Sequence, residues 1–144
     1  MSYNIQVESS PSDNDIRVLV NGIHDHNTQY SGDAEAQIIS LFLRDEQGAV
    51  VGGAYGWTAF GWLRIDVLWV REDLRGRGFG TQLLLATEAE GIRRGCKFAT
   101  LDSFSFQAPR LYKKNGYKEF AVLDNVAGQQ TWHFLKKELK PENR

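Results

Sequence analysis

A glycine-rich segment with two arginines, Arg75-Gly76-Arg77-Gly78-Phe79-Gly80, constrains this chain more than any other feature of its sequence. It lies between an apolar run at 62–70, typical of a strand, and a run with helical spacing at 78–94. Alternate glycines remove Cβ atoms, so a ligand can approach the main chain closely. The following helix offers unpaired N–H groups and the positive end of its dipole. This strand–loop–helix unit predicts a site for a phosphate or pyrophosphate group.

The charges around the loop favour an anion site. A helix start ordinarily carries Asp or Glu in its first turn, yet residues 79–82 contain no acid and three arginines occur within residues 71–77. Positive charge at the positive end of a helix dipole is unfavourable unless an anion is bound there. Glu72 and Asp73 offset part of this charge, so a solvated turn with local ion pairs remains an alternative.

Length and charge limit the class of protein. A chain of 144 residues is long enough for one domain that buries roughly 70% of its unfolded surface. The net charge of −1 gives no basic field for nucleic acid. The one cysteine, Cys96, excludes an intramolecular disulfide and is typical of a reducing compartment. Because we find neither a signal-peptide pattern nor an apolar run of about 18 residues, we expect a cytoplasmic protein without membrane association. We expect a single domain over 1–140 and a tail at 141–144.

The spacing of apolar residues predicts an α/β fold. We expect a mixed, mostly antiparallel sheet with helices on both faces. Its one parallel pair joins strands 62–70 and 97–102, because a helix between two strands makes a crossover connection. Alternation places Asp66 on the strand face opposite Leu63, Ile65 and Val67. The predicted strands are 3–8, 36–44, 49–60, 62–70, 97–102, 117–123 and 131–139, and the predicted helices are 12–26, 78–94 and 108–115.

Two commoner glycine-rich signatures fit the loop less well. A P-loop needs Gly-Lys-Ser/Thr after its four variable residues, and Gly80-Thr81 lacks the lysine. The dinucleotide fingerprint needs G-x-G-x-x-G directly after a strand, whereas Thr81 replaces the last glycine and the loop begins several residues past Val70. The best point for the dinucleotide alternative is Asp102, which stands near the place of a ribose-binding acid.

Two segments together resemble the GNAT N-acetyltransferase superfamily. Residues 75–80 look like the pyrophosphate loop of that family, and Ala108 to Tyr117 resembles its A-x-x-L-Y-x-K-x-G-F segment. The order of predicted strands and helices also matches, so the resemblance covers nearly the whole chain. It implies an acyltransferase that moves acetyl from acetyl-CoA, without a metal, to a primary amine of a small molecule or peptide. Because members of this family often dimerise, the resemblance is also compatible with a homodimer.

The resemblance assigns a cofactor site. The main chain of Leu68-Trp69-Val70 would pair with the pantetheine amides, and family strands usually splay apart beyond this point. The N–H groups of residues 75–81 would hold the pyrophosphate, with charge-assisted bonds from the arginines. Lys114 matches a lysine near the phosphates, although a solvated role is an alternative for it and for Arg77. Ser105 stands where many members have Asn, and Gln107 can replace that contact. The cofactor-binding candidates are Leu68, Trp69, Val70, Arg75, Gly76, Arg77, Gly78, Phe79, Gly80, Thr81, Gln107 and Lys114.

Tyr112 and Asp66 are the catalytic candidates that the resemblance implies. Tyr112 matches a tyrosine commonly assigned as general acid, and a phenol with a pKa near 10 can donate a proton to a leaving thiolate. A lysine-like amine, with a pKa near 10.4, arrives protonated, so a base must accept a proton directly or through water. Many members carry a carboxylate on the strand of Asp66. A salt bridge with Arg64 is the alternative role, and Asp102 is a second acidic candidate.

Three further features leave their own alternatives open. The segment 101–107 is rich in aromatic residues, and with Tyr55, Trp57 and Trp62 it can line an acceptor pocket for a ring or a cation. Aromatic residues at strand spacing are, however, more often core. The three histidines show no metal-ligand spacing, and Cys96 is poorly placed as a nucleophile. The alternative function is a catalytically weak acetyl-CoA-binding regulatory module.

Overall fold

The computed structural model describes residues 2–32, 36–107 and 109–141. The chain forms two compact units, Met1–Glu35 and Ala36–Arg144. Ala108, at the start of a predicted helix, and residues 142–144 of the predicted tail lie outside the described residues. The single domain over 1–140 stays a prediction. The elements are α1 (Asp13–Ser31), β1 (Gln37–Arg44), β2 (Val50–Ala59), β3 (Trp62–Val70), a 3-10 turn (Glu72–Leu74), α2 (Phe79–Arg93), β4 (Phe98–Phe104), α3 (Pro109–Lys114), β5 (Lys118–Val126) and β6 (Gln130–Glu138).

The first unit contains helix α1, which begins where the sequence predicts. Ser12 is its N-cap, and the Ser12 Oγ accepts a hydrogen bond from the backbone N–H of Asp15 at 3.1 Å. The helix ends at Ser31, beyond the predicted end near residue 26, because Gly32 provides the C-cap and the Ser31 hydroxyl donates to the preceding turn.

The predicted strand at residues 3–8 is wrong, because these residues have no regular secondary structure. Alternation defines two faces, but a strand also needs a partner for its backbone N–H and C=O groups.

None of the helices formed by the described residues is long and apolar enough to cross a membrane.

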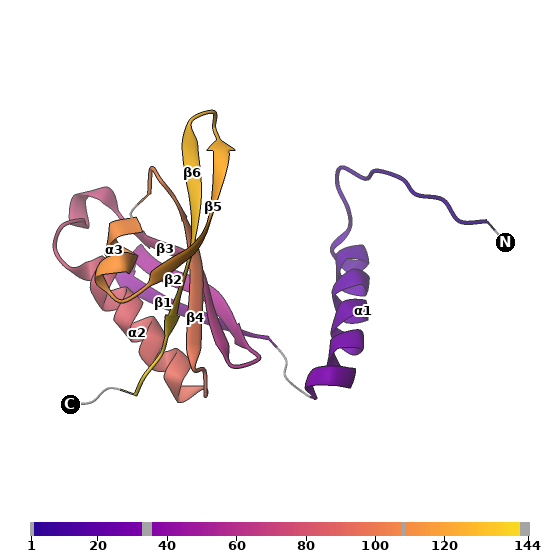
Figure 1. Ribbon diagram of the computed structural model, residues 1–144, viewed down its shortest axis with the longest axis horizontal. Coiled ribbons are helices and arrows are strands. Elements are labelled where there is room, and N and C mark those ends of the chain that lie inside the picture. Colours follow the sequence, from indigo (N-terminus) through magenta and orange to yellow (C-terminus); the bar gives the residue numbers. More distant parts are fainter. Residues whose placement is uncertain (1, 33–35, 108, 142–144) are drawn as a thin grey trace. The chain divides into compact units, whose positions relative to one another are not determined.

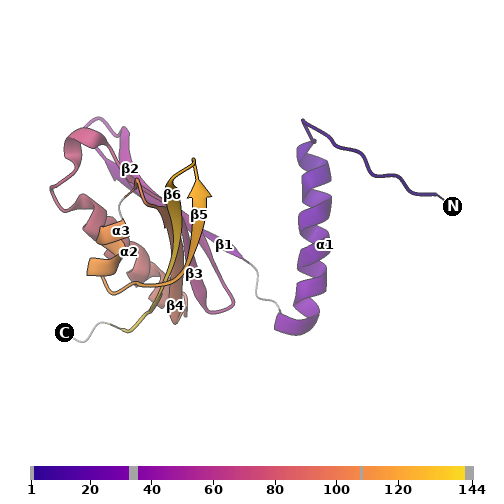
Figure 2. The ribbon, with the colours of Figure 1, turned by 45° about the horizontal axis from the view of Figure 1, so that its top comes forward.

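The second unit is built on a six-stranded sheet in the order β1-β2-β3-β4-β6-β5 (Figure 1). Strands β3 and β4 are parallel, because α2 crosses between them, and the other neighbouring pairs are antiparallel. Helices α2 and α3 lie on the same face of this sheet (Figures 1 and 2). The predicted α/β fold, with a mostly antiparallel sheet and one parallel pair, is confirmed.

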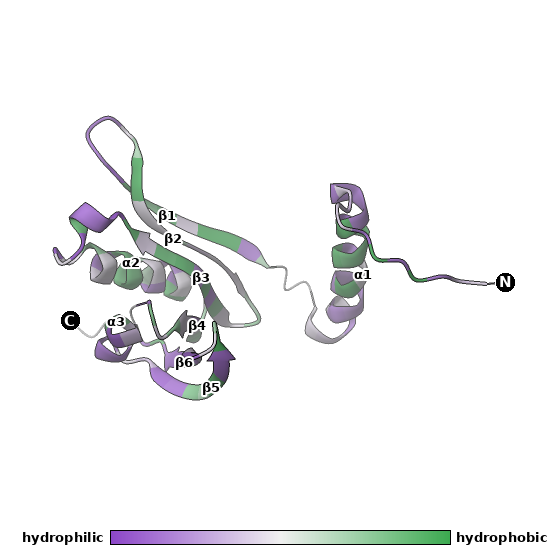
Figure 3. Cartoon of the chain, turned by 90° about the horizontal axis from the view of Figure 1, so that it is seen from above, coloured by the Kyte–Doolittle hydropathy of each residue, from purple (hydrophilic) through white to green (hydrophobic). Residues whose placement is uncertain are grey.

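The core lies between α2 and the sheet. Leu84 of α2 and Leu63 of β3 are fully buried at 0% exposure, and Figure 3 shows hydrophobic residues on α2 and on β1 to β3. Gly91 allows the close approach of helix to strand, since a Cβ there would lie 3.2 Å from the Leu63 Cδ2 atom. Burying each such leucine stabilises the fold by roughly 1.5–3 kcal/mol.

A β-bulge interrupts β3 at Asp66. Gly56 of β2 pairs with Ile65, and the preceding residue Tyr55 pairs with Val67, so Asp66 has no partner on β2. An extra residue of this kind bends the strand and changes the direction of the side chains that follow.

The bulge reverses the faces of β3. Leu68 packs against the core on the side of Leu63, whereas Val67 is 51% exposed. The sequence places Val67 on the buried face, and this prediction is wrong because simple alternation does not survive a one-residue insertion.

We expect Gly56→Ala to destabilise the sheet beside the bulge. A Cβ at this position would lie far inside van der Waals contact with the Arg64 carbonyl oxygen, which is backbone and cannot swing away. The free energy of unfolding, measured by urea denaturation, should fall by at least about 2 kcal/mol. The control is Gly22→Ala in α1, where the new Cβ meets nothing within 4 Å, and it should raise stability by roughly 0.5–1 kcal/mol. Unchanged stability of Gly56→Ala would contradict this account of the bulge.

Candidate active site

A cavity of about 760 Å³ opens where β3 and β4 separate. The parallel pairing stops at Ile65 and Leu101, so the last part of β3 has no partner on β4. The volume is typical of a small-molecule site. Of the candidates, Arg77 and Lys114 lie outside the wall, and the structure brings the others together. These are Asp66, Leu68, Trp69, Val70, Arg75, Gly76, Gly78, Phe79, Gly80, Thr81, Gln107 and Tyr112.

The glycine loop forms one end of the cavity. Gly76 and Gly78 have φ angles of 77° and 88°, a region that favours glycine. Gly78 is the N-cap of α2, which has no side-chain cap and no acid in its first turn. The first N–H groups of α2 therefore lack intrahelical partners beside the cavity, which suits a bound anion.

The arginines around the loop have three different arrangements. Arg71 pairs with Asp73, with 2.6 Å between Nε and Oδ1, and this hydrogen bond holds the pKa of the Asp73 carboxyl below its usual value. Arg75 donates from Nε to the Val70 carbonyl oxygen at 2.8 Å, which ties the loop to the end of β3. Arg77 lies 5.5 Å from the centre of the Phe79 ring. The predicted local ion pairs therefore exist at Arg71, whereas Arg75 and Arg77 form none with the described residues.

Tyr112 of α3 lines the same cavity and packs against the core. Burial raises the pKa of its phenol above the ordinary value of 10.0, and the negative charge of Asp102 adds to the rise. The phenol is therefore protonated at neutral pH and is available as a proton donor.

A buried polar network supports Tyr112. The Tyr117 ring lies edge-on to the Tyr112 ring, with 6.0 Å between the centroids. The Tyr117 hydroxyl donates to Glu88 Oε2 at 2.8 Å, and Lys137 Nζ donates to Glu88 Oε1 at 2.7 Å. Burial, followed by the charge of Glu88, raises the pKa of the Tyr117 phenol. The network fixes the Tyr117 ring and therefore one of the surfaces against which the Tyr112 ring packs.

Sequence reasoning missed Glu88, which looks like an ordinary acid in the middle of a helix. Its side chain is 6% exposed. The signal that would have found it is its spacing, because Glu88 lies four residues after Leu84 and three before Gly91 and so shares their buried face.

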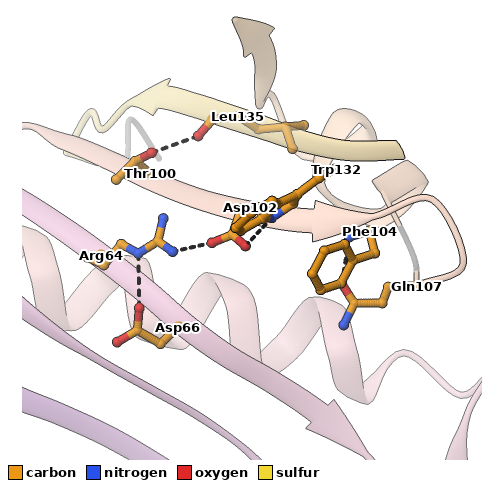
Figure 4. A network of polar contacts seen from close by, with 8 residues as sticks. All are labelled: Arg64, Asp66, Thr100, Asp102, Phe104, Gln107, Trp132 and Leu135. Atoms are coloured by element: carbon orange, nitrogen blue, oxygen red, sulfur yellow. Dashed lines mark hydrogen bonds and ion pairs between the residues drawn. The ribbon is translucent and has the colours of Figure 1, made fainter. Parts of the chain in front are cut away.

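A second network surrounds the predicted base (Figure 4). Arg64 donates from Nε to Asp66 Oδ1 at 3.0 Å and from Nη2 to Asp102 Oδ1, and so bridges β3 and β4. Trp132 of β6 donates from Nε1 to Asp102 Oδ2 at 2.6 Å. The predicted salt bridge of Asp66 with Arg64 therefore exists, yet Asp66 Oδ2 makes no hydrogen bond to any described residue. Asp66 has a free oxygen at the cavity, whereas both oxygens of Asp102 are engaged.

The turn after β4 holds Gln107 in the cavity wall. Gln107 Oε1 accepts from the Phe104 backbone N–H at 2.7 Å, so its amide nitrogen is left for a ligand (Figure 4). Ser105 points elsewhere, because its Oγ donates to Gln130 at 2.6 Å and accepts from the Thr131 N–H at 3.1 Å. Ser105 therefore fastens the turn to β6.

Cys96 does not line the cavity, and burial raises the pKa of its thiol. Within residues 2–32, 36–107 and 109–141, we find no group of three or more His, Cys, Asp or Glu side chains that could hold a metal ion.

We expect the Glu88 network to be most sensitive to loss of its cation. Lys137→Met leaves a buried carboxylate without its ion pair and should lower the free energy of unfolding by about 3 kcal/mol. Tyr117→Phe removes one neutral donor and should cost about 1–2 kcal/mol. Urea denaturation compares the two, with the exposed Lys140→Met as the control that should change little. A larger loss for Tyr117→Phe than for Lys137→Met would refute this ranking.

Comparisons with known proteins identify the family of this chain. A family model described as an acetyltransferase (GNAT) domain matches residues 37–119. The chain is 31% identical over 112 residues to an acetyltransferase of Agrobacterium fabrum, covering 78% of this chain and 82% of the relative. It is 33% identical over 104 residues to the blasticidin-S acetyltransferase of Streptomyces morookaense, covering 72% of this chain and 76% of that relative. The crystal structure of a Bacillus cereus acetyltransferase superposes with a TM-score of 0.80 at 34% identity, covering 93% of this chain and 98% of that one. The chain therefore belongs to the GNAT acetyltransferase family.

Proposed function

We propose that this protein transfers acetyl from acetyl-CoA directly to a primary amine of a small molecule or peptide. One observation carries the proposal: a single cavity joins a glycine loop suited to an anion, a partly buried phenol and a carboxylate with a free oxygen. A similar protein that is named as a blasticidin-S acetyltransferase supports a small-molecule acceptor.

The residues of the cavity fit acetyl-CoA. The part of β3 beyond Ile65 has an edge without a partner on β4, which suits the amides of an extended pantetheine arm. In this proposal Leu68 to Val70 hold that arm, residues 75–81 hold the pyrophosphate, and Gln107 adds a polar contact. Arg77 and Lys114 lie outside the wall and contribute only as nearby positive charges.

The side chains divide the proton transfers between them. Bound acetyl-CoA supplies a thioester whose carbonyl carbon is open to attack by an amine. A protonated amine loses two protons on its way to the amide. Asp66 Oδ2 accepts the first, directly or through water, which frees the nitrogen lone pair to form the C–N bond. Tyr112 donates its phenolic proton to the sulfur as the C–S bond breaks, and the second proton of the amine, passed on through water, restores the phenol. Asp66 is favoured over Asp102 as the base because Arg64 and Trp132 occupy both oxygens of Asp102.

We expect Gly78→Ala to weaken CoA binding. The substitution forces an alanine to a φ of 88° and puts a methyl group beside the first N–H groups of α2. Calorimetric titration with CoA should show a loss of affinity of at least about tenfold. Gly95→Ala is the matched control, because its φ of 90° brings the same backbone strain away from the loop, and its Cβ meets nothing within 4 Å. Equal CoA affinities for both variants would show that the loop does not hold the phosphates.

We expect Tyr112→Phe to slow chemistry while leaving CoA affinity within about twofold of the wild type. Loss of a general acid typically costs 10²–10⁴-fold, so kcat should fall by at least about 100-fold. Equal losses of kcat and CoA affinity would mean that Tyr112 only packs.

The pH dependence of kcat provides a second measurement of the same role. An acid acts only while protonated, and the folded-state pKa of Tyr112 is raised above 10.0. The wild-type alkaline limb due to Tyr112 should therefore lie above about pH 10. A limb below pH 10 that disappears in Tyr112→Phe would contradict the assignment. Tight acetyl-CoA binding without CoA release in the presence of any amine would instead identify a regulatory module.

A further inference from the structure

We infer that the acceptor is a monoamine whose amine is attached to a planar aromatic body. This inference rests on the proposed function and names the substrate class for the acceptor side of the same cavity. Two features carry it: an exposed aromatic ring in the cavity wall, and a charge balance that accommodates one cation.

Phe106 presents a flat apolar surface to the cavity. It lies in the turn after β4, lines the cavity and is 61% exposed. Its ring stacks on the Phe104 ring, with 5.2 Å between the ring centroids and 7° between the planes. The Phe104 ring in turn packs against the Trp132 ring, also with 5.2 Å between the centroids. One face of Phe106 is therefore supported by other rings. A planar ring is the ligand group that gains most from stacking on such a wall.

Hydrogen bonds hold this aromatic wall in place without a ligand. The Phe104 backbone N–H donates to Gln107 Oε1, and Trp132 Nε1 donates to Asp102 Oδ2 (Figure 4). Phe104 and Trp132 are also paired residues of β4 and β6. Because Phe104 and Trp132 are already fixed, a ligand that stacks on Phe106 has only the Phe106 side chain itself to order.

The charged groups beside the wall accommodate a single cation. Asp66 and Asp102 share Arg64, so these two carboxylates and one guanidinium carry a net charge of −1. Arg75 also lines the cavity, but its side chain is tied to the Val70 carbonyl oxygen at the glycine loop. The two oxygens of Asp102 are engaged, which leaves Asp66 Oδ2 for the amine of the acceptor. A second ammonium group on the acceptor would find Arg64 or apolar rings in place of a carboxylate, and it would lose its hydration without a partner. The site therefore fits a monoamine better than a diamine.

Equilibrium binding tests this inference without requiring turnover. Calorimetry on the protein saturated with CoA compares 2-phenylethylamine with 2-cyclohexylethylamine, which is apolar but not planar, and with 1,5-diaminopentane. We expect 2-phenylethylamine to bind at least fivefold more tightly than the cyclohexyl amine and at least tenfold more tightly than the diamine. Steady-state kcat/KM values with acetyl-CoA should follow the same order.

Two variants of Phe106 assign the preference to this ring. Phe106→Leu should bring the affinities for 2-phenylethylamine and 2-cyclohexylethylamine within twofold of each other, because it removes the flat surface and keeps an apolar side chain. Phe106→Tyr keeps the ring and should retain the fivefold preference. CoA affinity serves as the check that each variant is folded.

The outcomes separate this inference from the proposed function. Tighter binding of the diamine, equal binding of the two apolar amines, or no binding of 2-phenylethylamine overturns the inference, and amine acetylation can still stand. The expected binding order without any acetylation supports the aromatic monoamine site and overturns the proposed transfer reaction.

Discussion

The site depends on the point where the parallel pairing of β3 and β4 stops. The two strands are paired from Trp62 to Ile65 and then separate, and the bulge at Asp66 lies directly after the last pair. The bulge bends β3 where the two strands begin to separate, and there Arg64 of β3 forms an ion pair with Asp102 of β4. The cavity is therefore a consequence of backbone geometry, and side chains refine it.

Strand β3 positions three parts of the proposed chemistry. β3 carries the bulged Asp66, continues as an edge without a partner on β4 and leads into the loop at residues 75–80. The Arg75 side chain fixes the loop to the last carbonyl group of that strand. Base, extended binding edge and anion loop therefore follow one another along the chain at spacings that the strand imposes. Tyr112 comes from α3, so the core contacts of that helix decide how the acid meets the other groups.

Local patterns in the sequence predict much of the fold. An apolar run predicted the limits of β3, and a glycine predicted the start of α2. The crossover rule predicted the parallel pair. The bulge did not, because it depends on the missing side chain of Gly56 on another strand. The bond from Trp132 to Asp102 joins residues 30 positions apart, and the burial of Glu88 depends on tertiary packing. The sequence therefore predicted which chemical groups line the cavity, and tertiary contacts decided which atoms of these groups are free.

Asp102 connects the two halves of the proposed site. Burial raises the pKa of the Tyr112 phenol, and the charge of Asp102 adds to that rise. The same carboxylate holds the Trp132 ring behind Phe104 and takes part of the charge of Arg64. If Asp102 lost its charge, the acid would lose its proton more readily and the aromatic wall would lose an anchor. Proton donation and acceptor recognition are therefore coupled through one residue that itself needs no contact with the reacting atoms.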